Sequence, residues 1–170
     1  MTGIYRVLLL ITFVVFSTSS AICAKNIIPV EGATANDWPN KSFWHPNWGE
    51  SGVHKGIDIF ADKGTSVLSS TMGLVIFKGE FGIGGNAIMV LGPWLKIHYY
   101  AHLDKFHIKL FNFVSQGEII GAVGDTGNAK GRDPHLHYQI MTPIPYFWKW
   151  DKSEQGWKKM FYLNPENYIL

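Results

Sequence analysis

The sequence contains a single cysteine, Cys23, so no disulfide bond can form within the chain. Charged side chains are sparse, at 16% of the residues, and the net charge of +2 is too small to indicate a nucleic-acid partner. Beyond the N-terminal segment, no window has the apolar spacing of an amphipathic helix, and there are no internal repeats or low-complexity linkers. These absences argue against an α-helical domain, a repeat protein and a nucleic-acid-binding protein.

The composition that remains is typical of one folded domain. A chain of 170 residues has room for a single hydrophobic core. Hydrophobic residues make up 46% of the chain and aromatic residues 15%, whereas a disordered chain would have little of either.

Residues 1–24 have the order of a secretory signal peptide. A short basic head with Arg6 precedes an apolar run over residues 7–16, and a small, polar segment follows it. Cleavage can follow Ala21 or Ala24. The alternative is an uncleaved membrane tether, because the apolar segment is almost long enough to span a bilayer. Both interpretations predict export, to the periplasm, the cell envelope or the exterior.

Residues 25–53 form a lead-in rich in Pro, Asn and Trp, and an aromatic C-terminal extension covers residues 143–170. Between them, in residues 54–142, short β-type runs alternate with glycine-containing breaks. The runs are residues 57–60, 65–69, 74–77, 87–91, 95–100, 118–123 and 135–140. Strands this short at this spacing predict an all-β, single-domain fold built on an antiparallel β-sheet.

Two polar pairs stand out in this β-type sequence. His54 and Asp58 are four residues apart in a segment whose β-branched residues favour an extended chain, so both side chains can share a strand face. His135 and His137 follow the same rule, with Leu136 expected to face the core. Imidazole and carboxylate groups suit zinc, and a catalytic zinc site uses three protein ligands and leaves a fourth position for water.

At this point the sequence resembles the lysostaphin/LytM-type peptidases, the M23 metallopeptidase family. The matching motifs are His54-Lys-Gly-Ile-Asp58, Gly64-Thr65, Gly73-Leu-Val, Tyr100-Ala-His102-Leu, Gly117, Gly121, Gly124-Asp-Thr-Gly127-Asn and His135-Leu-His137. They occur in the family's order and spacing from about His54 to Ile140, roughly half of the chain.

The resemblance implies an antiparallel β-sheet whose open substrate groove holds one Zn²⁺ ion. It implies that His54, Asp58 and His137 are the zinc ligands. His102 and His135 match the two family histidines that flank the water, with the roles of general base and oxyanion stabiliser left open between them. The implied activity is that of a zinc metalloendopeptidase that hydrolyses peptide bonds in peptidoglycan stem peptides or cross-links.

Two other functions compete with this interpretation. One is a non-catalytic, LytM-like regulatory or cell-wall-binding module, against which the unsubstituted set of five site residues argues. The other is a biotinyl- or lipoyl-type carrier domain, because residues 114–121 resemble a hairpin of that fold. A carrier domain needs no His-Leu-His motif, and this chain has no lysine in a Met-Lys-Met-like tip.

Some residues near these motifs have an open role. His98 alternates with Tyr100 and His102, and we expect a packed strand histidine rather than a partner of the site. Asp133 can perturb a histidine or hydrogen-bond its own loop, and the second role is favoured because Asp is a common turn residue. The aromatic residues of the lead-in and the extension can line the groove or, as we favour, cover the core. The lead-in can also cover the zinc.

The export prediction can be tested on protein recovered from the cell envelope. N-terminal sequencing should find a mature chain that begins between about residues 22 and 25, because signal peptidase cuts after a small residue. An intact Met1 would show that the segment is retained as a tether.

Overall fold

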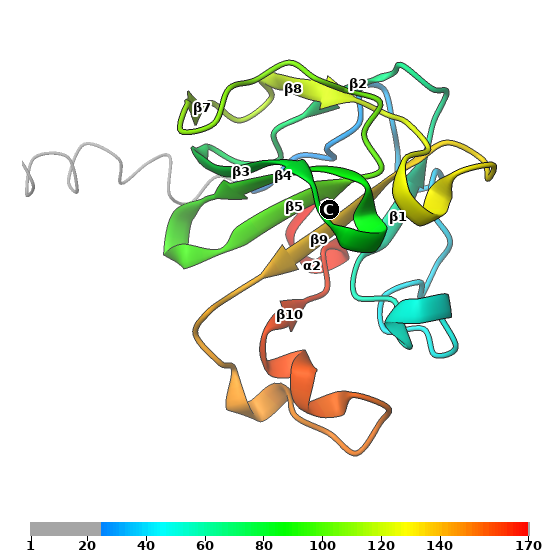
Figure 1. Cartoon of the computed structure of the whole chain (residues 1–170). Coiled ribbons are helices and arrows are strands. Elements are labelled where there is room, and N and C mark those ends of the chain that lie inside the picture. Colours follow the sequence, from blue (N-terminus) through cyan, green and yellow to red (C-terminus); the bar gives the residue numbers. More distant parts are fainter. Residues whose placement is uncertain (1–24, 170) are drawn as a thin grey trace, which may run out of the picture.

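The computed structural model describes residues 25–169, and the predicted signal segment lies outside the described residues (Figure 1). Two antiparallel sheets dominate this part of the chain. The larger has the order β1 (Ile57–Phe60), β9 (His135–Met141), β5 (Ile97–Ala101), β4 (Asn86–Leu91), β3 (Gly73–Glu80) and β7 (Phe113–Val114), with β10 (Tyr162–Leu163) also paired to β9. The smaller has the order β2 (Ser66–Leu68), β8 (Ile119–Ala122) and β6 (Lys105–Phe106). The all-β prediction is confirmed.

Helical structure in the described residues is limited to short turns. These are the 3₁₀ turns η1 (Gly49–Ser51), η2 (Gly82–Gly84), η3 (Pro93–Leu95), η4 (Gly127–Ala129), η5 (Phe147–Lys149) and η6 (Gly156–Met160), and the α-helix α2 (Glu166–Ile169). Within residues 25–169, no helix has the length and apolar character needed to cross a membrane.

Each of the seven predicted strand segments contains a strand of the structure. The largest difference between a predicted and an observed strand end is in β3, which continues past the predicted end at residue 77 to Glu80. Sequence analysis did not predict β6, β7 and β10, which are two residues long each. Strands of this length contain no alternation that a pattern could reveal.

Alternate residues of the large sheet face opposite sides. Along β9, Leu136, Tyr138 and Ile140 are fully buried in the main core, as predicted, while His135 and His137 face the other side of the sheet. Val67 of β2 and Ile120 of β8 belong to the same core cluster. The core therefore lies between the two sheets, and the opposite face of the large sheet is free to form a groove.

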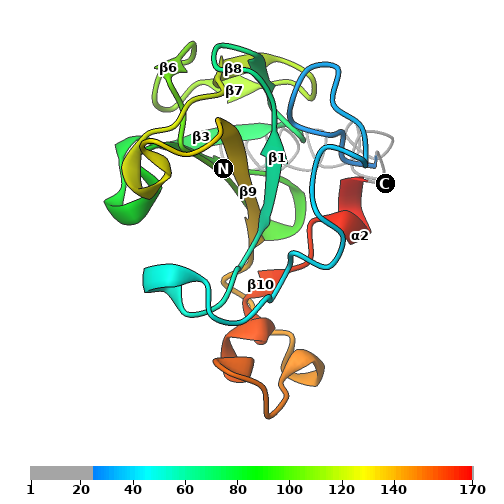
Figure 2. The same cartoon turned by 90° about the vertical axis from the view of Figure 1, so that its right-hand side faces the viewer.

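Both flanks of the predicted peptidase region contribute to this core. Trp38 of the lead-in is buried, and its indole N–H donates to Glu166 Oε1 at 3.1 Å. Leu163 and Ile169 of the extension are buried in the same cluster. Figure 2 shows the lead-in running beside α2, where Asn26 N–H donates to the Tyr168 carbonyl. The core needs these flanks because the central strands alone leave part of it uncovered.

His98 is a packed core histidine, as the sequence analysis favoured. Its side chain is 1% exposed, and a 2.7 Å hydrogen bond joins its Nδ1 to the Tyr138 hydroxyl. It shares the core face with Tyr100 but not with His102, because β5 ends at Ala101 and His102 has a φ of 64°. Burial, helped by the charge of Lys96, lowers the pKa of His98 to about 3.

The pKa of His98 predicts how stability depends on pH. Below about pH 6.5 the unfolded chain binds a proton at this residue that the folded chain does not, so stability falls as pH drops from about 6.5 towards 3. His98→Gln should remove this contribution, worth about 1.4 kcal/mol per pH unit within that window. Urea unfolding of both proteins with a chelator present, at several pH values from 7 to 4, measures the difference. Parallel pH profiles for the two proteins would contradict the prediction.

Candidate metal centre

The central position of β9 brings the predicted site residues together. In the sheet, β9 lies between β1 and β5, and His137 stands opposite Asp58 on one side and Ala101 on the other. His135 stands opposite Phe60. Asp58 and His137 therefore lie on neighbouring strands at the same level of the sheet, and His102 directly follows Ala101 at the end of the third strand.

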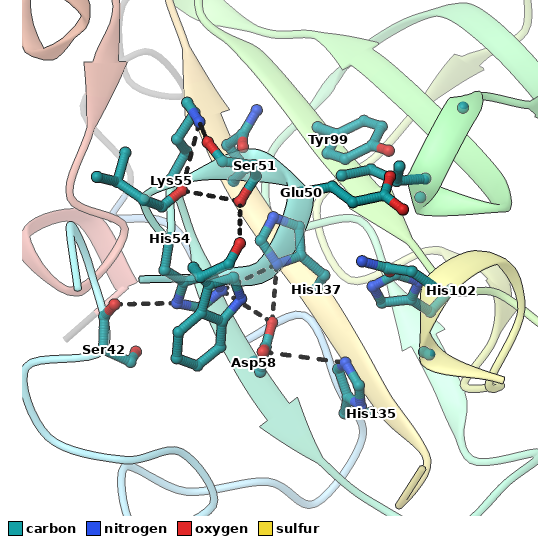
Figure 3. A pocket seen from close by; sticks show the side chains of 18 of the residues that line it. Ser42, Glu50, Ser51, His54, Lys55, Asp58, Tyr99, His102, His135 and His137 are labelled. Atoms are coloured by element: carbon teal, nitrogen blue, oxygen red, sulfur yellow. Dashed lines mark hydrogen bonds and ion pairs between the residues drawn. The ribbon is translucent and has the colours of Figure 1, made fainter. Parts of the chain in front are cut away.

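His54, Asp58 and His137 form a compact set of donor atoms (Figure 3). His54 Nε2 lies 3.1 Å from Asp58 Oδ1 and 3.1 Å from His137 Nδ1, and His137 Nδ1 lies 2.7 Å from Asp58 Oδ1. Ligand atoms of a tetrahedral zinc site with bonds of about 2.0–2.1 Å are about 3.3 Å apart. The spacing and chemistry of this donor set therefore fit a zinc ion.

His54 reaches the set from outside the sheet, contrary to the prediction that it shares a strand with Asp58. It lies in an extended segment before β1, where its backbone N–H donates to the His45 carbonyl. Its ring is 1% exposed and stacks on Trp48, with the ring centroids 4.1 Å apart. This packing fixes the orientation of the ring.

Backbone carbonyls fix the protonation of three site histidines. Ser42 O lies 2.9 Å from His54 Nδ1, Thr126 O lies 2.8 Å from His102 Nδ1, and Asp133 O lies 2.8 Å from His135 Nδ1. A carbonyl only accepts hydrogen bonds, so each Nδ1 carries the proton and each Nε2 keeps a free lone pair.

These three carbonyls were not identified from the sequence, because a main-chain contact leaves no residue pattern. The prediction that the Asp133 side chain hydrogen-bonds its own loop is wrong. Its main-chain oxygen holds the histidine, and no hydrogen bond of its carboxylate is found within residues 25–169.

The charge states of the cluster suit a cation. Burial alone would raise the pKa of Asp58, but the contacts with His137 and His54 outweigh it and hold this pKa well below its usual range. Burial and the neighbouring rings of His137 and His135 lower the pKa of His102 to about 4. The carboxylate is therefore ionised and His102 is neutral near pH 7, the states that metal binding and proton acceptance require.

His102 and His135 lie together on one side of the donor set (Figure 3). Their ring centroids are 5.0 Å apart, and His135 Nε2 lies 3.9 Å from Asp58 Oδ2. Both residues are 7% exposed and line the groove. The left-handed backbone at His102 turns its ring towards the site, and such backbone strain is typical of functional positions.

The site opens into a groove of about 830 Å³ on the free face of the large sheet. Its floor includes Met89, Tyr99 and Gln139 from the central strands, and its walls are the loops around η1, η2 and η4. The prediction that the aromatic residues cover the core holds only in part. Trp38 is buried in the core, whereas Trp48 lines the groove. Phe147, Trp148 and Trp150 do neither and are exposed.

Two lysines line the end of the groove that the C-terminal extension forms. Lys158 belongs to η6, and Lys55 directly follows His54. Burial and the positive charge of Lys158 lower the pKa of Lys55, and the opposing effect of Glu154 is the smallest of the three. Gln155 Nε2 donates to Ser51 O at 2.9 Å and Trp44 Nε1 donates to Glu154 O at 3.1 Å, which joins the extension to the lead-in.

A model of peptidase family M23 matches residues 52–150, more than half of the chain. The chain belongs to this family. Its M23 region contains all five candidate site residues, and the three histidine-containing motifs that suggested the family are those that meet in the groove.

Known relatives and solved structures agree with the family. The L-Ala–D-Glu endopeptidase of Bacillus subtilis is 34% identical over 142 residues, which are 72% of this chain and 44% of that protein. The catalytic domain of lysostaphin from Staphylococcus simulans has a TM-score of 0.63 and 27% identity, covering 78% of this chain and 92% of that domain. A zinc-containing peptidase from Vibrio cholerae has a TM-score of 0.57 and 30% identity, covering 69% of this chain and 36% of that one.

The M23 chain spans less than half the length of the curated relatives it matches. The likeness therefore concerns the domain and its groove, and the relatives carry further segments that this sequence does not match.

Gly56 is a position beside the donor set that leaves no room for a side chain. A Cβ added there would lie 2.4 Å from the Tyr138 carbonyl oxygen and 3.0 Å from the ring of His137. Gly56→Ala should lower the free energy of unfolding by about 1–3 kcal/mol, because the sheet must shift to accept the methyl group. It should also weaken zinc binding at least about tenfold, because His137 must move with it.

The matched control is Gly32→Ala. Gly32 has a φ of 74° but no atom within 4 Å of an added Cβ, so the variant loses some stability without disturbing the site. Thermal unfolding and competitive zinc titration measure both effects. Unchanged zinc affinity in Gly56→Ala would show that His137 does not hold the metal from this position.

Proposed function

We propose that this protein is a zinc metalloendopeptidase that hydrolyses peptide bonds in peptidoglycan. The observation that carries the proposal is the three-residue donor set in an open groove, beside two histidines whose Nδ1 atoms each face a backbone carbonyl. The family supports it, since the related proteins named above are endopeptidases or peptidases and one of them contains zinc.

One Zn²⁺ ion per chain would be held by His54 Nε2, Asp58 Oδ1 and His137 Nδ1. The remaining side of this set faces the groove, where the substrate has access. When bound, zinc supplies a Lewis acid that lowers the pKa of a water molecule to about 7 and polarises the scissile carbonyl. The two imidazoles and the carboxylate leave the ion with a net positive charge, which this chemistry needs.

His102 and His135 would carry out the proton transfer and the charge stabilisation. Their Nδ1 protons are held by backbone carbonyls, so each Nε2 is available on the groove side. In the neutral form one Nε2 takes the proton from the attacking water. The other, once protonated, donates a hydrogen bond to the oxygen that becomes negative during attack.

The substrate we propose is a peptide of the bacterial cell wall. The open groove admits an extended chain, and the Bacillus subtilis relative is named for a bond between L-Ala and D-Glu. Peptidoglycan lies outside the cytoplasmic membrane, so the protein must be exported, in agreement with the signal sequence expected in residues 1–24.

The proposal predicts two classes of variant. His54→Ala, Asp58→Ala and His137→Ala should each lose zinc and activity together, because a three-ligand site cannot hold the metal with two. His102→Ala and His135→Ala should keep the zinc and lose about 10²–10⁴-fold in rate, the usual contribution of acid–base assistance. Metal analysis and digestion of purified cell walls, with mass analysis of the products, measure both properties.

The other results have distinct meanings. Full zinc occupancy in Asp58→Ala would remove that residue from the ligand set, and metal-free His102→Ala or His135→Ala would add a histidine to it. Wild-type protein that binds zinc without turnover on any wall would indicate a regulatory or wall-binding module in place of an enzyme.

A further inference from the structure

One end of the groove carries positive charge, and what we infer from it rests on the proposed function. Lys55 and Lys158 both line the groove, at the end where the extension meets the lead-in. Figure 3 shows Lys55 on the side of the donor set away from His102 and His135. The two lysines are therefore separate from the histidines that act on the scissile bond.

Neither lysine is neutralised within the described part of the chain. The Lys55 ammonium donates to the carbonyls of Ser51 and Val53, at 2.8 and 3.3 Å, and the Lys158 ammonium donates to Gln155 Oε1 at 2.7 Å. These acceptors are uncharged, and no ion pair joins either lysine to a carboxylate among residues 25–169. An ammonium has three N–H donors, so each lysine keeps at least one for a ligand.

Two other lysines form ion pairs in the described part of the chain. Lys63 lies 2.7 Å from Asp125, and Lys159, the next residue after Lys158, lies 2.5 Å from Asp151. Holding two partly buried positive charges close together is unfavourable unless an anion joins them. Lys55 and Lys158 line one groove and repel each other, and the nearby Glu154 compensates this repulsion only in part. Such an arrangement suits an anion-binding subsite.

We propose that Lys55 and Lys158 form a subsite for a free carboxylate of the substrate peptide. A carboxylate placed between the two ammonium groups accepts a charge-assisted hydrogen bond from each, and partial burial strengthens both. An internal glycine bridge has no carboxylate to offer, whereas wall peptides with acidic residues do. The subsite therefore favours acidic stem peptides over glycine bridges.

The test uses one preparation of directly cross-linked cell wall in two forms. One form is native, and in the other the free carboxyl groups are converted to amides, which removes the charge and preserves the shape. The measured quantity is the ratio of kcat/KM on the native wall to that on the amidated wall. Wild-type protein should give a ratio of about ten, the factor expected for one charge-assisted hydrogen bond.

Lys158→Gln should bring this ratio close to one. Lys55→Gln, the second variant, should also lower the ratio. Lys159→Gln is the matched control, since it removes an adjacent lysine that is paired outside the groove, and it should keep the wild-type ratio. Zinc content and circular dichroism of each variant confirm that the site and the fold are intact.

The possible results separate the two proposals. If wild-type protein hydrolyses both walls and neither groove lysine changes the ratio, the carboxylate subsite is wrong and the endopeptidase assignment stands. If wild-type protein hydrolyses neither form nor a wall cross-linked by glycine bridges, the proposed function itself fails. Hydrolysis of the glycine-bridged wall alone would overturn the carboxylate subsite.

Discussion

The pairing of β9 between β1 and β5 is the constraint on which the site depends. Its register places His137 opposite Asp58 and Ala101, so a donor set drawn from distant parts of the sequence forms across adjacent strands. A shift of one residue would send His135 and His137 into the core and bring Leu136 to the groove. The burial of Leu136, Tyr138 and Ile140 opposes that shift, so the hydrophobic core specifies the position of the metal ligands.

The strand register places the site side chains, and backbone carbonyls then fix which ring nitrogen is protonated in three site histidines. Strand alternation decides which side chains face the groove, but it does not decide which ring nitrogen of a histidine carries the proton. The carbonyls of Ser42, Thr126 and Asp133 make that choice for three histidines. These residues come from the lead-in and the loop around η4, which means that the glycine-rich loops and the flanks set the chemistry of side chains that the strands only place.

Much of the fold and of the candidate site was accessible from the sequence, because both depend on alternation along short strands. Alternation predicted the faces of β9, and the motifs predicted which histidines would meet. It failed at His102, whose left-handed backbone breaks the pattern that places His98 and Tyr100 in the core. It also failed for His54, which approaches Asp58 from a segment outside the sheet. Left-handed residues and long-range loop contacts have no periodic pattern, so sequence analysis cannot place them.

The central strands and the flanking segments contribute different residues to the groove. The central strands and the residues next to their ends supply the donor set and the flanking histidines, all within the region that the M23 family model matches. The lead-in and the extension supply Trp48 at one wall and Lys158 at one end, and they are joined by hydrogen bonds such as that between Gln155 and Ser51. Because the flanks also contribute Trp38 and Leu163 to the core, they cannot vary freely. The strands therefore place the site side chains and the loops and flanks orient them, while the same core holds the flanks that line the groove.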